Sequence, residues 1–403
     1  MSSSERRKQP VKDKLKNILK TCGWERCIVA VFLVLVMAVG SVSLIVLPKE
    51  DFSPDENRML EEFPTISGES LIDGSFITGV ENFVSDHFML RRDFIALHTQ
   101  IMLASGKKDL ASNYGTVPAE GGVYFGKNDH IYEVLLPPDR TTVFEDNITS
   151  ITGFSKNAGL PLTILAVPSG AQEQADNLPA FAPEYDQREA LAAIEEKADA
   201  NTTVVDTFDA LSLENGDYYY KTDHHWNLEG AFVGYTEMAK AMGFTPVSRD
   251  QYEFEKVSDS FYGTLYSKAI YWGQKPDDFY LPRYKGENTL TQQTGESVRD
   301  DLFWTEYLEE KDKYSTFLGG NHSVDVIRNS AVKEGKLLLI KDSYANCMIP
   351  FLAQHFAEIH VVDLRYFNQD IYQYIEDNGI TQLAAVYSIK QLCDTDVASK
   401  LLK

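Results

Sequence analysis

The C-terminal part of the chain alternates between short apolar segments and segments with helical character. Apolar runs occupy residues 336–340, 358–364 and 382–388, and helical patterns occupy 345–356 and 368–377 between them. Strands that alternate with helices of this length form right-handed βαβ units, in which the strands are parallel. We therefore predict an α/β domain with a mostly parallel sheet. Ligands of such sheets bind beyond the carboxyl ends of the strands.

The same alternation is present earlier in the chain. The apolar segment 160–169 predicts a buried strand, 186–200 a helix and 202–208 a second strand, and Asn227 is a suitable cap for a helix that runs to Met242. Residues 121–135 predict a β-hairpin with a turn at 127–129. The stretch from about 245 to 330 is less regular and rich in aromatic residues and glycine, and we predict that it is an inserted lid-like region.

An apolar segment near the N-terminus predicts a membrane anchor. Residues 27–47 contain no charged side chain, and 21 residues suffice to cross a bilayer as a helix. Residues 1–48 hold eight basic residues against three acids (Arg6, Arg7, Lys8, Lys12, Lys14, Lys16, Lys20, Arg26; Glu5, Asp13, Glu25). By the positive-inside rule, residues 1–26 form a cytoplasmic basic tail and the rest of the chain is extracytoplasmic. A cleaved signal peptide is the alternative, although its apolar core is usually shorter.

The segment that follows the anchor, residues 48–109, predicts a helical stalk or packing arm, because its aromatic residues recur at steps of three and four. Residues 110–403 then form the α/β domain. Because residues 1–48 carry +5 of a total net charge of −22, the remainder carries −27. Such a surface disfavours nucleic acid, whose phosphates require clustered Lys and Arg.

One serine stands where an α/β fold places nucleophiles. Ser343 follows the predicted strand 336–340 directly, and a serine at a strand-to-helix turn projects its hydroxyl from the edge of the sheet. Amide N–H groups at the start of the next helix can stabilise an oxyanion there. The alternative is that Ser343 or Asp342 only caps the helix.

A serine nucleophile needs a base, and the sequence Asp223-His224-His225-Trp226 supplies one. Residues i and i+2 of an extended loop point the same way, so Asp223 can hold His225 and leave its Nε2 free for Ser343. His224 then points elsewhere and is structural.

The pair of histidines beside an aspartate also has the composition of a zinc site. A catalytic zinc normally takes three protein ligands and a supporting partner. The remaining histidines, at positions 87, 98, 130, 322, 355 and 360, form no H-x-x-x-H or similar pattern. We therefore predict a site without metal or other cofactor.

Together these residues carry a resemblance. Thr222 to Trp226 combined with Lys341-Asp342-Ser343-Tyr344 resembles the DHHW family of extracytoplasmic proteins, relatives of the alginate O-acetylation proteins with an SGNH-hydrolase-like domain. Further matching stretches lie along most of the chain after the anchor, at residues 56–58, 63–64, 124–127, 167–169, 263–267 and 362–366. The resemblance implies a three-layer α/β domain in which the two motifs occur in the reverse of the usual order.

The resemblance also implies a triad of Ser343, His225 and Asp223 that acts on acetyl esters of polysaccharide. Lys341 stands where related enzymes have glycine, which leaves the oxyanion donors unassigned. The Tyr344 amide, Asn346 and Gly263 are the candidates, and Trp226 is a candidate to stack on a sugar or to pack beside the histidine.

The function expected from these residues is a membrane-anchored O-acetyltransferase that modifies cell-surface or exported polysaccharide through a serine acyl-enzyme. The resemblance suggests that an integral-membrane acyltransferase hands over the acetyl group. Two alternatives remain at this point, a polysaccharide acetylesterase with the same triad and a non-catalytic scaffold for polysaccharide export.

Overall fold

The chain forms two compact units in a computed structural model, which describes residues 23–46, 48–53, 56, 58–110, 122–135, 142–182 and 185–401. The first unit holds the described residues up to 53 and Arg58–Phe94. The second holds residue 56 and the described residues from Ile95 onward. Each unit is described below by itself.

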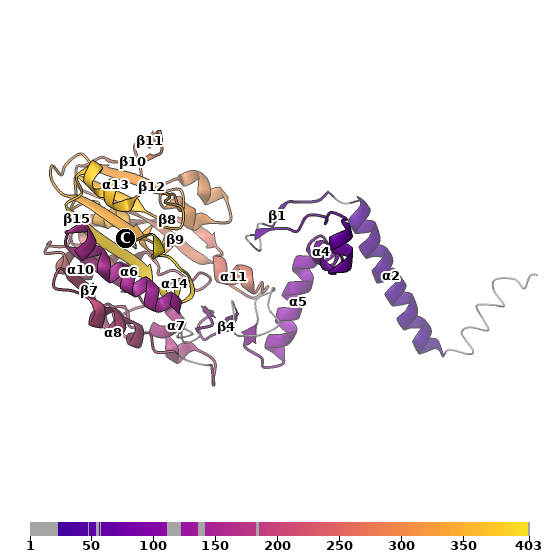
Figure 1. Cartoon of the computed structure of the whole chain (residues 1–403). Helices are drawn as coiled ribbons and strands as arrows, with labels where there is room; N and C mark the ends of the chain where they lie inside the picture. The colour runs from indigo at the N-terminus through magenta and orange to yellow at the C-terminus, as the bar shows by residue number, and fades with distance from the viewer. Residues whose placement is uncertain are drawn as a thin grey trace, which may run out of the picture. The chain divides into compact units, whose positions relative to one another are not determined.

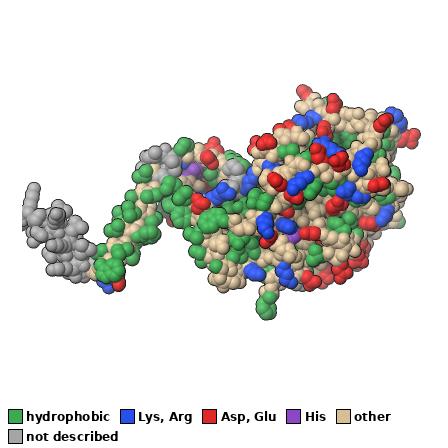
Figure 2. Space-filling view, turned by 180° about the vertical axis from the view of Figure 1, so that it is seen from behind, with side chains coloured by type: hydrophobic (Ala, Val, Ile, Leu, Met, Phe, Trp, Pro, Cys, Tyr) green, Lys and Arg blue, Asp and Glu red, His purple; other side chains and the backbone are tan. Residues whose placement is uncertain are grey.

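The first unit begins with the long helix α2 (Trp24–Val46), whose side chains are largely apolar (Figure 2). The stretch Trp24–Val42 is long and apolar enough to cross a membrane, and almost none of it is buried in protein. A signal sequence has the same properties. The predicted anchor falls in this helix apart from residue 47, while residues 1–22 of the predicted basic tail lie outside the described residues.

The rest of the first unit is small and mostly helical. Its elements are a two-residue antiparallel pair, β1 (Phe52–Ser53) with β2 (Arg58–Met59), and the helices α3 (Gly68–Ile72) and α4 (Ser75–Asp86), followed by the start of α5 (Arg91–Ala104). Arg58 donates to the Asp86 carboxylate at 2.5 Å, and Phe63 packs edge-on against Phe83. The helical prediction for this stretch is confirmed, and its role as a stalk stays a prediction.

An eight-stranded sheet forms the centre of the second unit (Figure 1). Its order is β11-β10-β12-β14-β13-β15-β6-β7. The five strands from β14 to β7 are parallel, and β12, β10 and β11 continue the sheet in antiparallel fashion. The strands span β6 Leu162–Val167, β7 Thr202–Val205, β10 Leu290–Thr294, β11 Ser297–Arg299, β12 Val324–Asn329, β13 Lys336–Lys341, β14 Glu358–Val362 and β15 Gln382–Ser388. The predicted α/β class with a mostly parallel sheet is confirmed.

Both faces of the sheet are buried at its central parallel strands β14, β13, β15 and β6, which explains why these strands read as continuous apolar runs. In β13, Leu337 and Leu339 face one hydrophobic cluster, and Leu338 and Ile340 face the other. The first cluster includes residues of α10 (Leu228–Ala241) and α12 (Ile349–Leu352). The second includes residues of α6 (Thr142–Ala158), α8 (Arg188–Lys197), α13 (Ile371–Asn378) and α14 (Ile389–Asp394). The result is a three-layer arrangement.

Smaller elements surround these layers. Strands β3 (Asp109–Leu110), β4 (Val123–Phe125) and β5 (Ile131–Glu133) form a small antiparallel sheet that contains the predicted hairpin, whose turn residues Asn128 and Asp129 have positive φ. The long strands β8 (Tyr252–Phe261) and β9 (Asp277–Tyr284) pair with each other. Short helices are α7 Gly170–Glu173, α9 Phe208–Leu211 and α11 Thr264–Lys268.

Two predictions differ from the structure in detail. The predicted helix 345–356 is reduced to a 3₁₀ turn at Ser343–Ala345 and the single turn α12. Pro350 lies in the first turn of α12. Because proline has no N–H, it cannot make the hydrogen bond that would extend this helix toward residue 345. The stretch 245–330, predicted to be a lid-like insertion, contains β8 and β9 and also supplies β10, β11 and β12 to the central sheet.

Candidate functional site

The Asp-His-His-Trp sequence lies in a tight turn that leads into α10. Tyr219 and Trp226 form an isolated antiparallel bridge across the turn, and the Asn227 N–H donates to the Tyr218 carbonyl at 2.8 Å. The Asn227 side chain then accepts from the Gly230 N–H at 3.0 Å, which caps α10 as predicted. The helix therefore fixes one end of the turn.

Asp277 on β9 holds the other end of the turn. Its carboxylate accepts from the backbone N–H of Lys221 and of Thr222, each at 2.9 Å, and from the Thr222 hydroxyl at 2.6 Å. Burial raises the pKa of Asp277, while these hydrogen bonds lower it in part. No sequence motif marked Asp277, because its partners lie more than fifty positions earlier in the chain.

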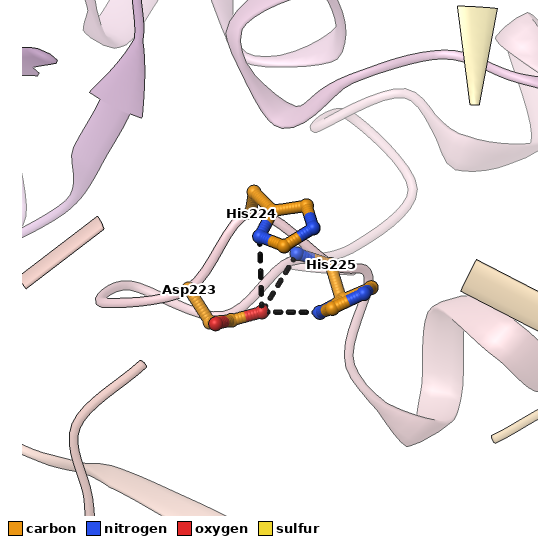
Figure 3. A group of neighbouring side chains, drawn as sticks. All are labelled: Asp223, His224 and His225. Carbon is orange, nitrogen blue, oxygen red and sulfur yellow. Dashed lines mark hydrogen bonds and ion pairs between the residues drawn. The ribbon is translucent and has the colours of Figure 1, made fainter. Parts of the chain in front are cut away.

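Asp223 and His225 are bonded to each other inside this turn (Figure 3). The Asp223 Oδ1 lies 2.5 Å from His225 Nδ1 and accepts from the His225 backbone N–H at 3.0 Å. Both side chains are almost completely buried. A hydrogen bond at Nδ1 fixes the ring and leaves Nε2 as the atom that faces outward.

Ser343 is the residue that Nε2 faces. Its Oγ lies 2.7 Å from His225 Nε2, although 118 positions separate the two residues. The serine is partly exposed and follows β13, at the carboxyl edge of the sheet. Asp342 caps the turn beneath it, where one carboxylate oxygen accepts from the Tyr344 N–H at 2.9 Å and the other from the Ser388 N–H at 2.7 Å. Asp342 is therefore the residue that caps the turn, and the Ser343 hydroxyl does not serve as the cap.

The charge of Asp223 is stabilised by its neighbours. Burial by itself raises the pKa of a carboxyl group, but the charges of His225 and His224 and several hydrogen bonds lower the pKa of Asp223 far below its ordinary value. One of these bonds comes from the Thr264 N–H at 2.7 Å, at the start of α11. Asp223 is therefore a carboxylate at any physiological pH.

His224 approaches the same oxygen of Asp223 as His225 does, with its Nδ1 3.7 Å from Oδ1 (Figure 3). Its Nδ1 lies 2.6 Å from the Thr264 hydroxyl, and its ring is tilted by 37° to that of His225, with centroids 3.8 Å apart. Burial, assisted by the charge of His225, lowers the pKa of His224 to about 4. The ring is therefore neutral at neutral pH, and it makes no contact with Ser343 among the hydrogen bonds of the described residues.

Asp223, His224 and His225 also offer ligand atoms that lie within 4.8 Å of one another, a spacing that suits a metal ion. The Asp223 Oδ1 and His225 Nδ1 atoms are bonded to each other at 2.5 Å, and His225 Nε2 faces Ser343. A metal would have to replace these bonds. A site without metal stays the prediction.

The other predicted residues are engaged elsewhere. Trp226 is fully buried and donates from Nε1 to the Tyr344 carbonyl at 2.9 Å, so it packs between the two motifs and presents no face to a sugar. The Tyr344 N–H is bonded to Asp342 and the Gly263 N–H to Thr222 Oγ1 at 3.1 Å. The candidate oxyanion roles of these two amides therefore lack support in the geometry.

Asn346 is fully buried behind Ser343. Its Nδ2 lies 3.3 Å from the Asn321 Oδ1, and its own Oδ1 has no hydrogen-bond partner among the described residues. Asn321 Oδ1 also accepts from Lys341 Nζ at 2.5 Å. The Asn321 Oδ1 thus faces both Lys341 and Asn346. The N–H bonds of the same amide group therefore point away from these two residues.

A known family model matches the segment that carries both motifs. Residues 177–362 match the model described as DHHW protein, and this segment is similar in sequence to that family. The sequence matches none of the curated proteins with which it was compared.

Two of the following three solved structures share the fold with this chain at low sequence identity, and the third is more distantly similar. A DHHW family protein from Eubacterium siraeum is 24% identical, with a TM-score of 0.58, over 70% of this chain and 94% of that one. Bacillus cereus PatB1, solved with a sulfonyl adduct, is 22% identical, with a TM-score of 0.57, over 68% and 97%. The O-acetyltransferase domain of Pseudomonas putida AlgJ is 14% identical, with a TM-score of 0.45, over 68% and 93%.

Tyr314, in the segment that matches the family model, was not predicted from the sequence, and the structure gives Lys341 an environment that the sequence did not predict. Tyr314 lies flat against His225, with ring centroids 3.9 Å apart and an interplanar angle of 6°, and its hydroxyl donates to the Ser343 carbonyl at 2.9 Å. Lys341, which replaces the expected glycine, is buried, and burial lowers its pKa to about 8. A tyrosine 29 positions before the serine gives no signal in the sequence alone.

Proposed function

We propose that this protein is an O-acetyltransferase that acts on extracytoplasmic polysaccharide through an acyl-enzyme on Ser343. The observation that carries the proposal is the continuous chain of short contacts from Asp223 through His225 to Ser343 Oγ. A nucleophile, a base and a buried carboxylate that orients the base are the parts that acyl transfer needs. The DHHW family match agrees with the resemblance to O-acetylation proteins on which the choice of reaction rests.

The reaction takes place in two steps. Ser343 Oγ attacks the carbonyl carbon of a donor ester while its proton passes to His225 Nε2, and the donor alcohol leaves with that proton. A sugar hydroxyl then attacks the acetyl-serine ester, gives its proton to His225 Nε2, and departs as the acetylated sugar while Ser343 recovers its proton. Asp223 stays ionised throughout and stabilises the imidazolium that forms in each step.

Each tetrahedral intermediate carries a negatively charged oxygen, and Asn321 is the side chain we assign to it. Lys341 and Asn346, which flank Ser343 in sequence, both bond the Asn321 Oδ1 and thereby orient its N–H bonds. The loop that carries Asn321 precedes β12, whose first residue pairs with the end of β14 at the carboxyl edge of the sheet. An N–H donor preorganised at this edge stabilises developing charge.

The side of the membrane on which the proposed reaction takes place depends on helix α2. If α2 is an uncleaved anchor with residues 1–26 in the cytoplasm, the second unit lies outside, where acetyl-CoA is absent. The acetyl group then has to be delivered across the membrane, and an integral-membrane acyltransferase is the partner we propose for that step.

Ester hydrolysis by the purified full-length protein in detergent tests the nucleophile. We expect Ser343→Ala to lower the release of p-nitrophenol from p-nitrophenyl acetate by about 10³-fold or more, as loss of a triad member does. Ser297→Ala, in the exposed strand β11, is the matched control and should retain wild-type turnover. Equal turnover by Ser343→Ala and wild type would show that the proposed nucleophile is wrong.

A sulfonyl fluoride gives an independent readout, because such reagents modify activated serine hydroxyls and PatB1 has been solved with a sulfonyl adduct. Mass spectrometry of the digested protein should locate a single adduct on Ser343. Analysis of acetylated products with an oligosaccharide acceptor then separates transfer from simple hydrolysis. Acetate as the sole product, with every acceptor, would favour an esterase.

A further inference from the structure

A cavity of about 350 Å³ opens at the same edge of the sheet as Ser343. Its lining includes Tyr124 on β4, Glu133 on β5 and Gln172 in α7, the helix that follows β6, together with Tyr185, Asp186 and Arg188. We propose that this cavity binds one uncharged sugar residue of the acceptor glycan, so that the acceptor is a neutral or N-acetylated polysaccharide and not a polyuronate. This inference rests on the proposed function and names its substrate class.

The cavity lies close enough to the triad to serve it. The Ile131 N–H of β5 donates to the Lys221 carbonyl at 2.8 Å, so the strand that carries Glu133 contacts the segment that leads into the Asp223–His225 turn. The charge of Glu133 also opposes the lowering of the His224 pKa, and such effects are strong only over short distances. A volume near the lower end of ligand pockets, about 300–1,000 Å³, suits a single sugar residue.

Glu133 supplies the polar contact that a sugar needs. Its side chain is only 8% exposed, and no hydrogen bond or ion pair joins its carboxylate to another side chain in the described part of the chain. A buried carboxylate is costly unless hydrogen bonds satisfy it. Hydroxyl groups of a sugar are donors that can provide those bonds, and the rings of Tyr124 and Tyr185 offer apolar surface for the sugar ring.

The charges around the cavity disfavour an acidic sugar. Burial raises the pKa of Glu173, which lies next to the cavity residue Gln172, to about 7, and the charges of Asp206, Asp209 and Asp186 contribute against the opposing effect of Arg188. The carboxyl groups of these acidic residues therefore repel one another. Arg188 is the one basic residue among the described lining residues, and it is paired with Asp209 at 2.9 Å. A uronate would enter this cavity without a free cation.

Two lysines near Glu133 do not change this conclusion. Lys268 and Lys390 are both affected by the charge of Glu133, but neither is among the described residues that line the cavity. Lys390 is also paired with Asp394. Neither lysine is therefore a cation of the described cavity wall, whereas Glu133 belongs to it.

Binding of defined oligosaccharides tests the inference directly. Isothermal titration of the full-length Ser343→Ala protein in detergent would compare tetrasaccharides of N-acetylglucosamine and of glucose with a tetragalacturonate. We expect at least one neutral tetrasaccharide to bind ten or more times more tightly than the tetragalacturonate at physiological salt. Tighter or equal binding of the tetragalacturonate would overturn the inference, and so would the absence of binding by both neutral tetrasaccharides at 10 mM, about the concentration limit of weak sites.

Transfer kinetics locate the sugar in the cavity. For Glu133→Gln we expect the KM for the neutral acceptor to rise about tenfold. The KM for p-nitrophenyl acetate should change by less than this. Glu296→Gln, in the exposed turn between β10 and β11, removes a charge far from any lining residue and is the control. An unchanged acceptor KM in Glu133→Gln would overturn the placement. Because ester hydrolysis needs no glycan, failure of the triad assignment is seen separately.

Discussion

At the scale of single residues, the two histidines of the motif differ because of what surrounds them. His225 has Asp223 on one nitrogen and Ser343 on the other, which is the environment of a general base. His224 contacts Thr264 and the face of His225. Adjacent positions in a turn point in different directions, so one histidine reaches the serine and the other supports the carboxylate.

The lowered pKa of His224 predicts a specific dependence of stability on pH. Its pKa is about 4 when folded and near 6.5 when unfolded, so between these values the unfolded chain binds a proton that the folded protein does not. The free energy of unfolding should therefore fall as pH decreases from 6.5 to 4, by at most about 1.4 kcal/mol per pH unit from this residue.

Urea unfolding of wild type and His224→Gln at several pH values between 4 and 7.5 measures this effect. The difference in unfolding free energy between the two proteins should shift in favour of the variant as the pH falls, and stay constant above pH 7. Parallel curves for the two proteins would show that His224 titrates normally in the folded state. His355 and His360 also have lowered pKa values, but they are present in both proteins and cancel in the comparison.

At the scale of elements, the site is assembled where α11, the motif turn and the end of β13 meet. Gly263 lies at the contact between α11 and the turn, and a Cβ on it would be 2.2 Å from the Asp223 Cβ. Close packing is therefore the reason for a glycine at this position. The backbone conformation is not the reason, because a φ of −86° is open to any residue. Trp226 joins the motif turn to the 3₁₀ turn after β13 through its hydrogen bond to the Tyr344 carbonyl.

Gly263→Ala should accordingly disturb catalysis and stability together. The added methyl group displaces Asp223 or α11, which we expect to cost about 1–3 kcal/mol, as overpacking of a tight contact does, and to lower ester hydrolysis. Gly153→Ala, in the middle of α6 with open space around its Cβ, is the control and should stabilise the protein slightly. Thermal unfolding and p-nitrophenyl acetate turnover report both effects. A Gly263→Ala protein as stable and active as wild type would contradict this packing.

At the scale of the whole molecule, an apolar helix and an acidic α/β unit share one chain. Helix α2 has the length and composition of a membrane span, and the part of the chain after residue 48 carries a large negative charge. Cys347 and Cys393 are both buried free thiols, so no disulfide between them stabilises the second unit. The central sheet is therefore held by the hydrophobic clusters on its two faces.

Protease protection tests the proposed orientation. In right-side-out bacterial vesicles, proteinase K should degrade the second unit, and in inverted vesicles the same unit should be protected until detergent is added. The positive charge of residues 1–26 is the reason, because basic segments stay on the cytoplasmic side. A protected second unit in right-side-out vesicles would reverse the orientation, and a shortened N-terminus by sequencing would identify a cleaved signal peptide.

The sequence by itself determined the layers of the fold and the two halves of the candidate site. Buried parallel strands leave continuous apolar runs such as 336–340, and their alternation with helices predicts the sheet. The contact between Asp223 and His225 could be predicted from their spacing, because this contact depends only on the local backbone geometry. The pairing of both with Ser343 followed from the rule that chemistry collects at the carboxyl edge of such sheets.

Tertiary structure decided the contacts that join distant segments. Asp277, Tyr314 and Asn321 reach the site from β9, from a 3₁₀ turn and from the loop before β12, and no local pattern distinguishes them from other polar or aromatic residues. The same reason explains why the sequence left two roles open for Trp226. Whether an aromatic side chain faces a ligand or the core depends on which strand packs over it, and that is settled only when the whole chain has folded.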